Sequence, residues 1–246
     1  MHILISNDDG IDAPGLAALE SALGDLGTTW VVAPDRERSA QSHTLTMHKP
    51  LFATPRGERR FSVSGTPADC VYMATYGLLP QRPDLVVSGI NRGANIGHDV
   101  HYSGTVAAAR EGCLQGIPAL SVSLAFIGEP KHFETAAELA KQVVQRMQQD
   151  GLRDDCHLNL NVPDLPLQSI RGIRPAPLGR RTYGHLVETR TDPRGRTYFW
   201  IGGPPLRFTD EGEEDGPTVQ SGYAALTPLS TLPTDRAMLE RLRGWF

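Results

Sequence analysis

The sequence has little cysteine and no long apolar run. Its three cysteines, Cys70, Cys113 and Cys156, form no CxxC pair, which argues against a disulfide framework or a zinc ribbon and favours a reducing compartment. No apolar segment approaches the roughly 20 residues that span a bilayer. The first residues, MHILISNDDG, reach a charge too early for a signal peptide. We therefore expect a soluble cytoplasmic protein with no membrane partner.

The sequence also lacks a strong charge of either sign. The formal net charge is −4 and the pI about 6.1, so no global field favours nucleic acid as a partner. The P-loop, GxSxG, HExxH and EF-hand patterns are missing, and GINRGANIG spaces its glycines four apart, unlike the GxGxxG fingerprint. The amino-acid composition is that of an ordinary globular protein, with 39% hydrophobic and 21% charged residues. A length of 246 residues is enough for one or two domains with a sizeable core.

Strand and helix patterns alternate through the first two thirds of the chain. Residues 2–6 are a buried apolar run, and a helix is expected from Pro14, with leucines at helical spacing and Gly27 as its C-cap. A second helix is expected where Thr66, Pro67 and Asp69 supply an N-cap, an N1 proline and an N3 acid. The alternation predicts a doubly wound, Rossmann-like α/β fold with a mostly parallel sheet. The other expected strands are 29–34, 84–89, 118–124 and 157–163, and the other helices 105–116 and 133–149.

The character of the sequence changes after Pro163. We expect residues 1–163 to form the catalytic core and residues 164–246 to form a β-hairpin-rich arm with a C-terminal helix, used for oligomerisation. RTYFWIGG (196–203) and GYAALTPL (222–229) alternate like hairpin strands, and 234–246 has helical periodicity. The acidic run 210–215 is interpreted as a solvated loop.

Three polar loops follow three of the expected parallel strands. They are residues 7–10, 35–42 and 89–99, and ligands of open parallel sheets bind beyond the carboxyl ends of the strands. In the first loop, Asp8 and Asp9 are adjacent acids that repel each other unless a cation compensates. Ser39 and Asn91 offer neutral oxygens from the other two loops, which suits a hard divalent ion such as Mg²⁺ or Mn²⁺. The alternative is that Asp8 caps the turn and Asp9 is solvated.

The segment after the third loop could hold a phosphate. Ser103, Gly104 and Thr105 open the helix expected at 105–116, and the first N–H groups of a helix have no partner within it. An ordinary N-cap is the alternative. Zinc is disfavoured because His98 and His101 have no third His or Cys nearby, and we interpret them as loop residues beside the site. An oxygen-ligated cation beside a phosphate seat favours hydrolysis of phosphate monoesters.

At these loops the sequence resembles the SurE (survival protein E) family of metal-dependent nucleotidases. The matching stretches occur in order: ILISNDDGIDAPGL, VVAPDRERSAQS, SGTPADCVY, DLVVSGINRGANIGHDVHYSGTVAAAREG, IPALSVSL and, more loosely, YFWIGGPP and GYAALTPL. The resemblance implies a Rossmann-like core, a β-rich dimerising arm with an exchanged C-terminal segment, and homodimers or homotetramers. It implies one divalent metal held by Asp8, Asp9, Ser39 and Asn91, with Asn95 and the Ser103–Gly104–Thr105 turn near the phosphate. The implied activity is hydrolysis of 5′- and 3′-nucleoside monophosphates, and sometimes of short polyphosphate.

The chain departs from the family pattern at three places. Ala40 stands where the family has Gly, Arg92 where a small residue is frequent, and Asp215-Gly216-Pro217-Thr218 where a Gly-Thr-Asp block is expected. None of these is a proposed metal ligand.

Several mechanisms remain open from the sequence. In one, Asp9 orients or deprotonates the attacking water; in another, Asp8 is a covalent nucleophile. The general acid is His98, His101 or a water on the metal. A non-catalytic nucleotide or phosphate sensor on the same fold is the alternative function, and the arginines between Arg171 and Arg207 raise a third, a nucleic-acid surface, which the negative net charge disfavours.

Overall fold

The centre of the fold is a nine-stranded sheet with the strand order β3-β4-β2-β1-β5-β6-β7-β13-β8. The computed structural model describes residues 1–126, 128–151, 155–183, 186–202, 205–208 and 212–245. From β4 to β7 every neighbouring pair is parallel, as the apolar runs predict. The strands are β1 (His2–Ser6), β2 (Thr28–Pro34), β3 (Ala53–Gly57), β4 (Arg60–Val63), β5 (Leu85–Arg92), β6 (Ala119–Ala125), β7 (Cys156–Pro163), β8 (Ile173–Pro175) and β13 (Ala224–Ser230).

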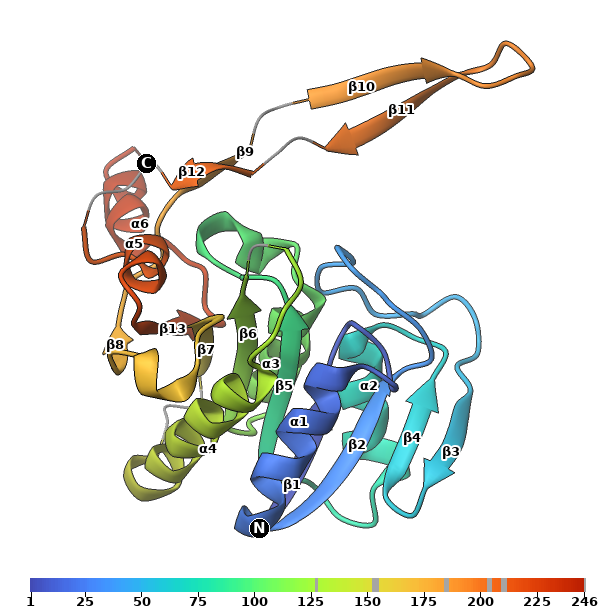
Figure 1. The fold of residues 1–246 in the computed structure, drawn as a ribbon, viewed down its shortest axis with the longest axis vertical. Helices are drawn as coiled ribbons and strands as arrows, with labels where there is room; N and C mark the ends of the chain where they lie inside the picture. The colour runs from blue at the N-terminus through green and yellow to red at the C-terminus, as the bar shows by residue number, and fades with distance from the viewer. Residues whose placement is uncertain (127, 152–154, 184–185, 203–204, 209–211, 246) are drawn as a thin grey trace.

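Helices cover both faces of this sheet (Figure 1). One face packs against α1 (Pro14–Leu23) and α4 (Phe133–Asp150), and the other against α2 (Pro67–Met73) and α3 (Gly104–Leu114). Alternation along β1 shows the two layers: Ile3 and Ile5 belong to the first cluster and Leu4 to the second. All three are fully buried, which explains why the strand has no polar face. The predicted Rossmann-like α/β fold is confirmed.

The predicted capping residues are found at a helix start and at a helix end. The expected capping box is present: Thr66 Oγ1 accepts from the Asp69 N–H, and Asp69 accepts from the Thr66 N–H. The predicted C-cap is also present: α1 ends at Leu23, the 3₁₀ turn η1 (Gly24–Leu26) continues it, and Gly27 is the C-cap of that turn. A Cβ at Gly27 would lie 2.2 Å from the Met1 carbonyl oxygen. Glycine at this helix end therefore also allows the close approach of two backbones.

The segment after Pro163 contributes to the main sheet as well as to an arm. Strand β13 pairs antiparallel with β7, and β8 pairs parallel with β13, so the expectation that GYAALTPL is a hairpin strand is wrong. Its alternation reflects a strand with Ala225 buried against the sheet. The arm itself consists of β9 (Arg181–Tyr183), β10 (Leu186–Thr191), β11 (Thr197–Gly202) and β12 (Pro205–Phe208).

The hairpin β10–β11 projects away from the sheet (Figure 1). Phe199, Trp200 and Ile201 on β11 are exposed, Ile201 at 92%. After the arm come α5 (Asp215–Gln220) and the expected C-terminal helix, α6 (Arg236–Arg243), in which no residue is buried. Along the described ranges, every helix falls short of the length and apolarity that crossing a bilayer demands.

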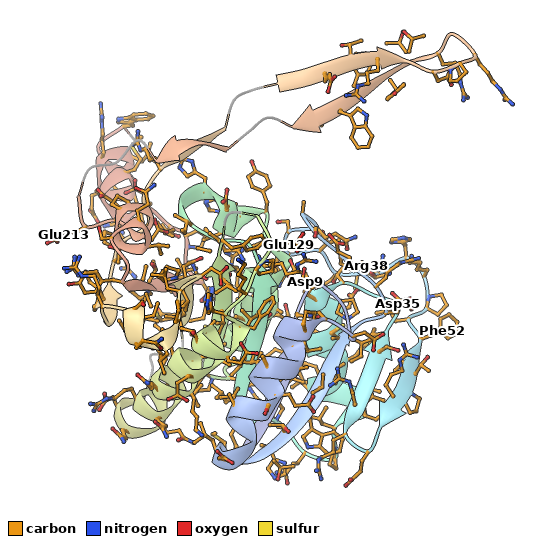
Figure 2. All side chains as sticks on the ribbon, viewed as in Figure 1. Asp9, Asp35, Arg38, Phe52, Glu129 and Glu213 are labelled. Atoms are coloured by element: carbon orange, nitrogen blue, oxygen red, sulfur yellow. The ribbon has the colours of Figure 1, made fainter. Side chains whose placement is uncertain are left out.

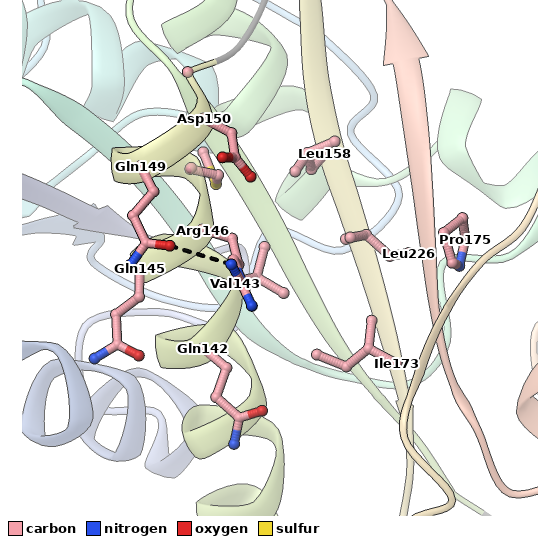
Figure 3. Close-up of a pocket in the computed structure, with 12 residues that line it drawn as sticks. Gln142, Val143, Gln145, Arg146, Gln149, Asp150, Leu158, Ile173, Pro175 and Leu226 are labelled. Atoms are coloured by element: carbon pink, nitrogen blue, oxygen red, sulfur yellow. Dashed lines mark hydrogen bonds between the residues drawn. The ribbon is translucent and has the colours of Figure 1, made fainter.

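A hollow of about 750 Å³ lies between α4 and strands β7, β13 and β8 (Figure 3). Val143, Leu158 and Leu226 supply apolar lining, and Arg146 donates to Gln149 at its rim, at 3.2 Å. Leu158 is near the amino-terminal end of β7. This hollow is therefore at the opposite end of the parallel strands from the loops that carry the predicted site.

Candidate active site

The first loop of the site is a tight turn after β1. The Asn7 amide donates to the Gly10 carbonyl oxygen at 2.9 Å, and the Asn7 oxygen accepts from the Gly10 N–H at 3.2 Å. Gly10 has φ +103°, and a Cβ there would lie 3.2 Å from the Arg36 backbone, so glycine is the residue that fits. The closed turn presents Asp8 and Asp9 just beyond the carboxyl end of the strand.

Backbone hydrogen bonds join the loops of this edge. In the loop after β2, the Arg38 N–H donates to the Asp8 carbonyl oxygen at 2.7 Å. At the end of β5, the Arg92 N–H donates to Asp9 Oδ2 at 3.1 Å. Figure 2 shows Asp9, Asp35 and Arg38 together above the strand ends. The predicted meeting of the three loops is confirmed.

Asp8 lies against the first turn of α3. It is 5% exposed, and Thr105 Oγ1 donates to its carboxylate. A Cβ on Gly104 would lie 2.8 Å from Asp8 Cβ and 3.0 Å from Oδ2, so the helix approaches this closely because residue 104 is glycine. Ser103 is the N-cap, and its Oγ accepts from the Val106 N–H at 3.1 Å. The positive end of the α3 dipole therefore faces the Asp8 carboxylate.

Both acids have raised pKa values. Burial raises the pKa of Asp8 to about 6; the Thr105 hydrogen bonds oppose this rise and the charge of Asp9 adds to it. Burial also raises the pKa of Asp9, with the Arg92 N–H opposing and the charge of Glu37 adding. Adjacent carboxyl groups of this kind remain ionised together when a cation compensates their charge.

The other two predicted ligands lie in the neighbouring loops. Ser39 is exposed, and its hydroxyl donates to Glu37 Oε1 at 2.7 Å. Asn91 Nδ2 donates to the Gly93 carbonyl oxygen at 2.8 Å, which leaves the amide oxygen as the atom suited to a cation. Ala40, beside Ser39, has φ +56°, in the left-handed region where the family's glycine fits without strain.

This donor set suits a hard divalent ion. It combines two carboxylates with a hydroxyl and an amide, all oxygen donors on converging loops. In the described part of the chain, no group of three or more His, Cys, Asp and Glu side chains is arranged for a metal. The predicted set has only two such side chains, Asp8 and Asp9, and draws its other oxygens from Ser39 and Asn91.

Asn95 is held by side chains that the sequence analysis did not single out. Its N–H donates to Asn161 Oδ1 at 2.8 Å, and its carbonyl oxygen accepts from Asn161 at 3.0 Å and from Asn159 at 2.9 Å. Its own Nδ2 donates to Ser123 Oγ at 2.8 Å. The signal was present in HLNLNVP, where asparagines alternate with apolar residues in a predicted strand. Polar residues on a buried face need partners, and here the partner is Asn95.

The interpretation of the acidic run is wrong at its last residue. Asp210 and Glu211 lie outside the described residues, and Glu213 is exposed. Asp215 is fully buried at the start of α5 and accepts the Gly97 N–H at 2.8 Å. A run of acids in the sequence gives no sign that one of them turns inward to bind backbone groups.

The histidines lie on η3 (Gly97–His101), the short turn before α3. His98 and His101 are both exposed. Ser42 binds this turn to the loop after β2, because its hydroxyl donates to the His101 carbonyl oxygen at 2.6 Å. The expectation that the histidines are loop residues beside the site fits this placement.

A hollow of about 300 Å³ opens beside Asp9. The Arg92 guanidinium, on its lining, is 3.2 Å from Glu129 Oε2, so this departure from the family pattern has an acidic partner. The lining residues come from the first two loops, the start of α1 and β5: Asp9, Gly10, Ile11, Asp12, Ala13, Pro14, Asp35, Arg36, Glu37 and Arg92.

Three of the described arginines in and near the arm contact other side chains. Arg190 pairs with Glu188 and Arg196 with Asp192, both at 2.8 Å. Arg174 stacks on the ring of Tyr223 at 3.9 Å. A nucleic-acid surface would need these arginines to contact phosphate groups. Their contacts with other side chains therefore disfavour that alternative.

Comparisons with known proteins show which family the chain resembles over its length. A family model described as Survival protein SurE matches residues 3–185. A protein named 5′-nucleotidase SurE from Citrifermentans bemidjiense is 48% identical over 245 residues, covering 100% of this chain and 99% of the relative. Another of that name from Alkalilimnicola ehrlichii is 49% identical over 247 residues, covering 100% and 95%. The crystal structure of the SurE protein from Aquifex aeolicus matches with a TM-score of 0.89 at 36% identity, covering 100% of this chain and 99% of that one.

Proposed function

The chain belongs to the SurE family, and on that basis we propose that it is a divalent-metal-dependent phosphomonoesterase. Its substrates are 5′- and 3′-nucleoside monophosphates, with short-chain polyphosphate as a further substrate. The observation that carries the proposal is the contact between the Asp8–Asp9 turn and the first turn of α3, where Thr105 bonds Asp8. A carboxylate pair suited to a cation thus adjoins a helix N-terminus suited to a phosphate.

Asp8, Asp9, Ser39 and Asn91 would hold the metal ion, Mg²⁺ or Mn²⁺. Bound there, such an ion supplies charge that polarises a phosphoryl oxygen and lowers the pKa of water. Among the protein groups, Asp9 is the base that orients or deprotonates the attacking water. It is the more accessible of the two acids and is held by the Arg92 N–H at 3.1 Å.

The start of α3 binds the substrate phosphate in this proposal. Gly104 contributes its N–H and Ser103 its hydroxyl proton, since Ser103 Oγ uses an acceptor site for the Val106 N–H. Thr105, predicted as a phosphate ligand, donates its hydroxyl hydrogen bond to Asp8 in this structure. We propose that it acts on the phosphate through the position of Asp8. Asn95 completes the binding of the substrate.

Direct attack by water is favoured over a covalent aspartyl-phosphate. Asp8 is 5% exposed, its Oδ1 accepts the Thr105 hydroxyl bond, and its carboxylate packs against Gly104, so the group has little access for in-line attack on a phosphorus atom. The two mechanisms are separated by quenching a single turnover with acid, using AMP whose phosphate carries a radioactive label, and measuring the label on the protein. Direct attack leaves the protein unlabelled, whereas a covalent intermediate transfers label to the protein in a form that hydroxylamine releases.

Phosphate release tests the function itself. Wild-type protein should release phosphate from 5′-AMP and 3′-AMP with Mg²⁺ or Mn²⁺, and EDTA should stop the reaction. Asp8→Asn should remove the activity. Asp84→Asn should not, because Asp84 binds the His2 N–H at the opposite edge of the sheet. Binding of AMP without turnover under any of these metals would instead establish the sensor alternative.

We also propose a cytoplasmic homodimer or homotetramer assembled through the arm. The exposed apolar side chains of β11 support a subunit contact, and three free cysteines suit a reducing compartment. Light scattering of the intact chain beside a variant carrying Phe199→Ser and Ile201→Ser tests the assembly. The wild type should have a multiple of the monomer mass and the variant a smaller mass.

A further inference from the structure

Asp215 is a buried carboxylate that the proposed reaction does not use. It is fully inaccessible, and its oxygens accept three backbone N–H groups. Oδ2 accepts from Gly97 at 2.8 Å, and Oδ1 accepts from Gly179 and Gly216, each at 2.9 Å. Burying a charged group is costly unless it is hydrogen-bonded in this way. Position 215 therefore needs a side chain that accepts several hydrogen bonds, which an ordinary first residue of a helix does not need.

The donors to Asp215 come from separate segments. Gly97 follows Asn95 by two residues in the loop between β5 and α3, the loop that we propose binds phosphate. Gly179 lies between β8 and β9, where the chain enters the arm, and Gly216 lies in α5, after the arm. The N–H of Asp215 also donates to the Pro177 carbonyl oxygen at 2.9 Å. Asp215 therefore connects the segment that enters the arm, the segment that follows it and the phosphate-binding loop. We call the segments before and after the arm, which contain Gly179 and Gly216, the root of the arm.

The geometry of the loop explains why this bond can position it. Gly97 has φ +56°, in the left-handed region, and it begins the η3 turn that leads into Ser103. On one side of Gly97, Asn161 and Asn159 hold the Asn95 backbone. On the other side, the bond from Gly97 to Asp215 fixes the direction in which the chain continues to α3.

We propose that Asp215 is a positioning residue that couples the phosphate-binding loop to the root of the arm. The proposal rests on the phosphomonoesterase function proposed above. Asp215 itself touches neither substrate nor metal. It acts by holding Gly97, and with it the spacing between Asn95 and the start of α3.

Asp215→Asn provides the first test, because an amide nitrogen replaces one of the two acceptor oxygens and opposes a backbone N–H. We expect the KM for AMP and the inhibition constant of inorganic phosphate to rise together, roughly five- to tenfold for the loss of one such bond. The Mn²⁺ concentration for half-maximal activity should stay within twofold, because Asn7 closes the Asp8–Asp9 turn independently of Asp215. Asp215→Ser is the second variant, to be used if the amide does not fold.

Asp164→Asn is the matched control. Asp164 also accepts backbone N–H groups at this edge of the sheet, from Lys131 and His132 at 3.1 and 2.8 Å, but it does not bind the loop between β5 and α3. The Asp164→Asn variant should be less thermally stable than the wild type but should have the wild-type KM for AMP and the wild-type inhibition constant of inorganic phosphate. Equal shifts in both constants for the two variants, or no shift in Asp215→Asn and Asp215→Ser, would overturn the positioning role.

Hydrogen exchange of the wild-type protein tests the coupling without turnover. Adding inorganic phosphate with Mn²⁺ should slow exchange in peptides covering residues 93–103 and also in those covering 175–180, because coupling between two sites is reciprocal. Slowing confined to 93–103 would overturn the coupling. Failure of the proposed function would look different: the wild type would release no phosphate from AMP, whereas failure of this proposal leaves an active wild type and unshifted variants.

Discussion

The Thr105 hydroxyl donates a hydrogen bond to Asp8, a residue 97 positions earlier in the chain. Thr105 is fully buried and Asp8 is 5% exposed, so water does not replace this bond if it is lost. A hydrogen bond to a charged group contributes about 1.5–3 kcal/mol in such surroundings. The pair therefore connects the end of β1 to the start of α3 and holds the two halves of the site together.

Thr105→Val should lower both stability and activity. The valine has nearly the same shape but no hydroxyl, so the Asp8 carboxylate loses a donor. We expect the free energy of unfolding to fall by about 1–3 kcal/mol and kcat/KM for AMP to fall roughly 10- to 100-fold. Urea titration and initial rates measure the two effects. Thr105→Ser keeps the hydroxyl and should stay close to wild type; a valine variant with wild-type kcat/KM would contradict the role given to this bond.

Asn161→Asp should weaken substrate binding through Asn95. The aspartate still accepts the Asn95 N–H, but it places an oxygen against the Asn95 carbonyl oxygen that Asn161 Nδ2 now binds at 3.0 Å. Two facing acceptors repel, so we expect the KM for AMP to rise roughly tenfold, with a stability loss of about 1–3 kcal/mol. Thr227→Val is the control, since Thr227 is 2% exposed on β13 and pairs in register with Asn159. That control should keep the wild-type KM, and an equal rise there would exclude a specific role for Asn161.

Ala40→Gly should stabilise the protein. Ala40 has φ +56°, a conformation that costs a residue with a Cβ roughly 1–2 kcal/mol. Glycine removes that strain but adds freedom to the unfolded chain, so the net gain is about 0.5–1 kcal/mol. Thermal unfolding measures it. Ala17→Gly, at an exposed position inside α1, should change stability in the opposite direction by about 1 kcal/mol. Destabilisation by both substitutions would show that Ala40 is not strained.

His157 should make stability depend on pH below neutrality. Burial, with the nearby charges of Arg110 and His43 adding to its effect, lowers the pKa of His157 from 6.5 to about 3. Between these values the unfolded chain binds a proton that the folded protein does not, so the free energy of unfolding rises with pH across this window. The stabilisation is complete above pH 6.5 and is lost as the pH falls towards 3.

His157→Gln removes that titration. Between pH 6 and 4.5, the wild type should lose about 1–2 kcal/mol more stability than the variant, as measured by urea unfolding at each pH. Between pH 7 and 8 the difference between the two proteins should be constant, which serves as the internal control. Parallel stability curves throughout the acid range would mean that His157 is charged in the folded state.

The regular elements could be predicted because each one repeats a local signal. Thr66 and Asp69 form a capping box within four residues, and Leu16, Leu19 and Leu23 mark the buried face of α1 by their spacing alone. The edge strand β3 and its antiparallel neighbour β4 were missed, because neither has a long continuous apolar run and most of β3 is exposed. Gly27 was correctly predicted at a helix end, but the sequence does not reveal that the Met1 backbone packs against it.

The candidate site was predictable where its residues follow strands. Asp8 and Asp9, Ser39 and Asn91 each come after an apolar run, so the rule for parallel sheets places them at one edge. Their supports were not predictable in the same way. Asn161 and Asp215 reach the loop between β5 and α3 from 66 and 118 residues away, and such contacts depend on the packing of whole elements rather than on local pattern.

The position of β13 has a consequence for how the chain is made. The strand pairs with β7 through Ala225 opposite Asn161, and the entire arm lies between the two in the sequence. During translation, β7 therefore leaves the ribosome long before β13, the strand that pairs with it. Until β13 is made, the peptide groups along that edge of β7 have no partner strand. Such edges recruit other chains, so a polypeptide cut short within the arm is expected to aggregate, and the last strand synthesised is the one that shields the nascent sheet.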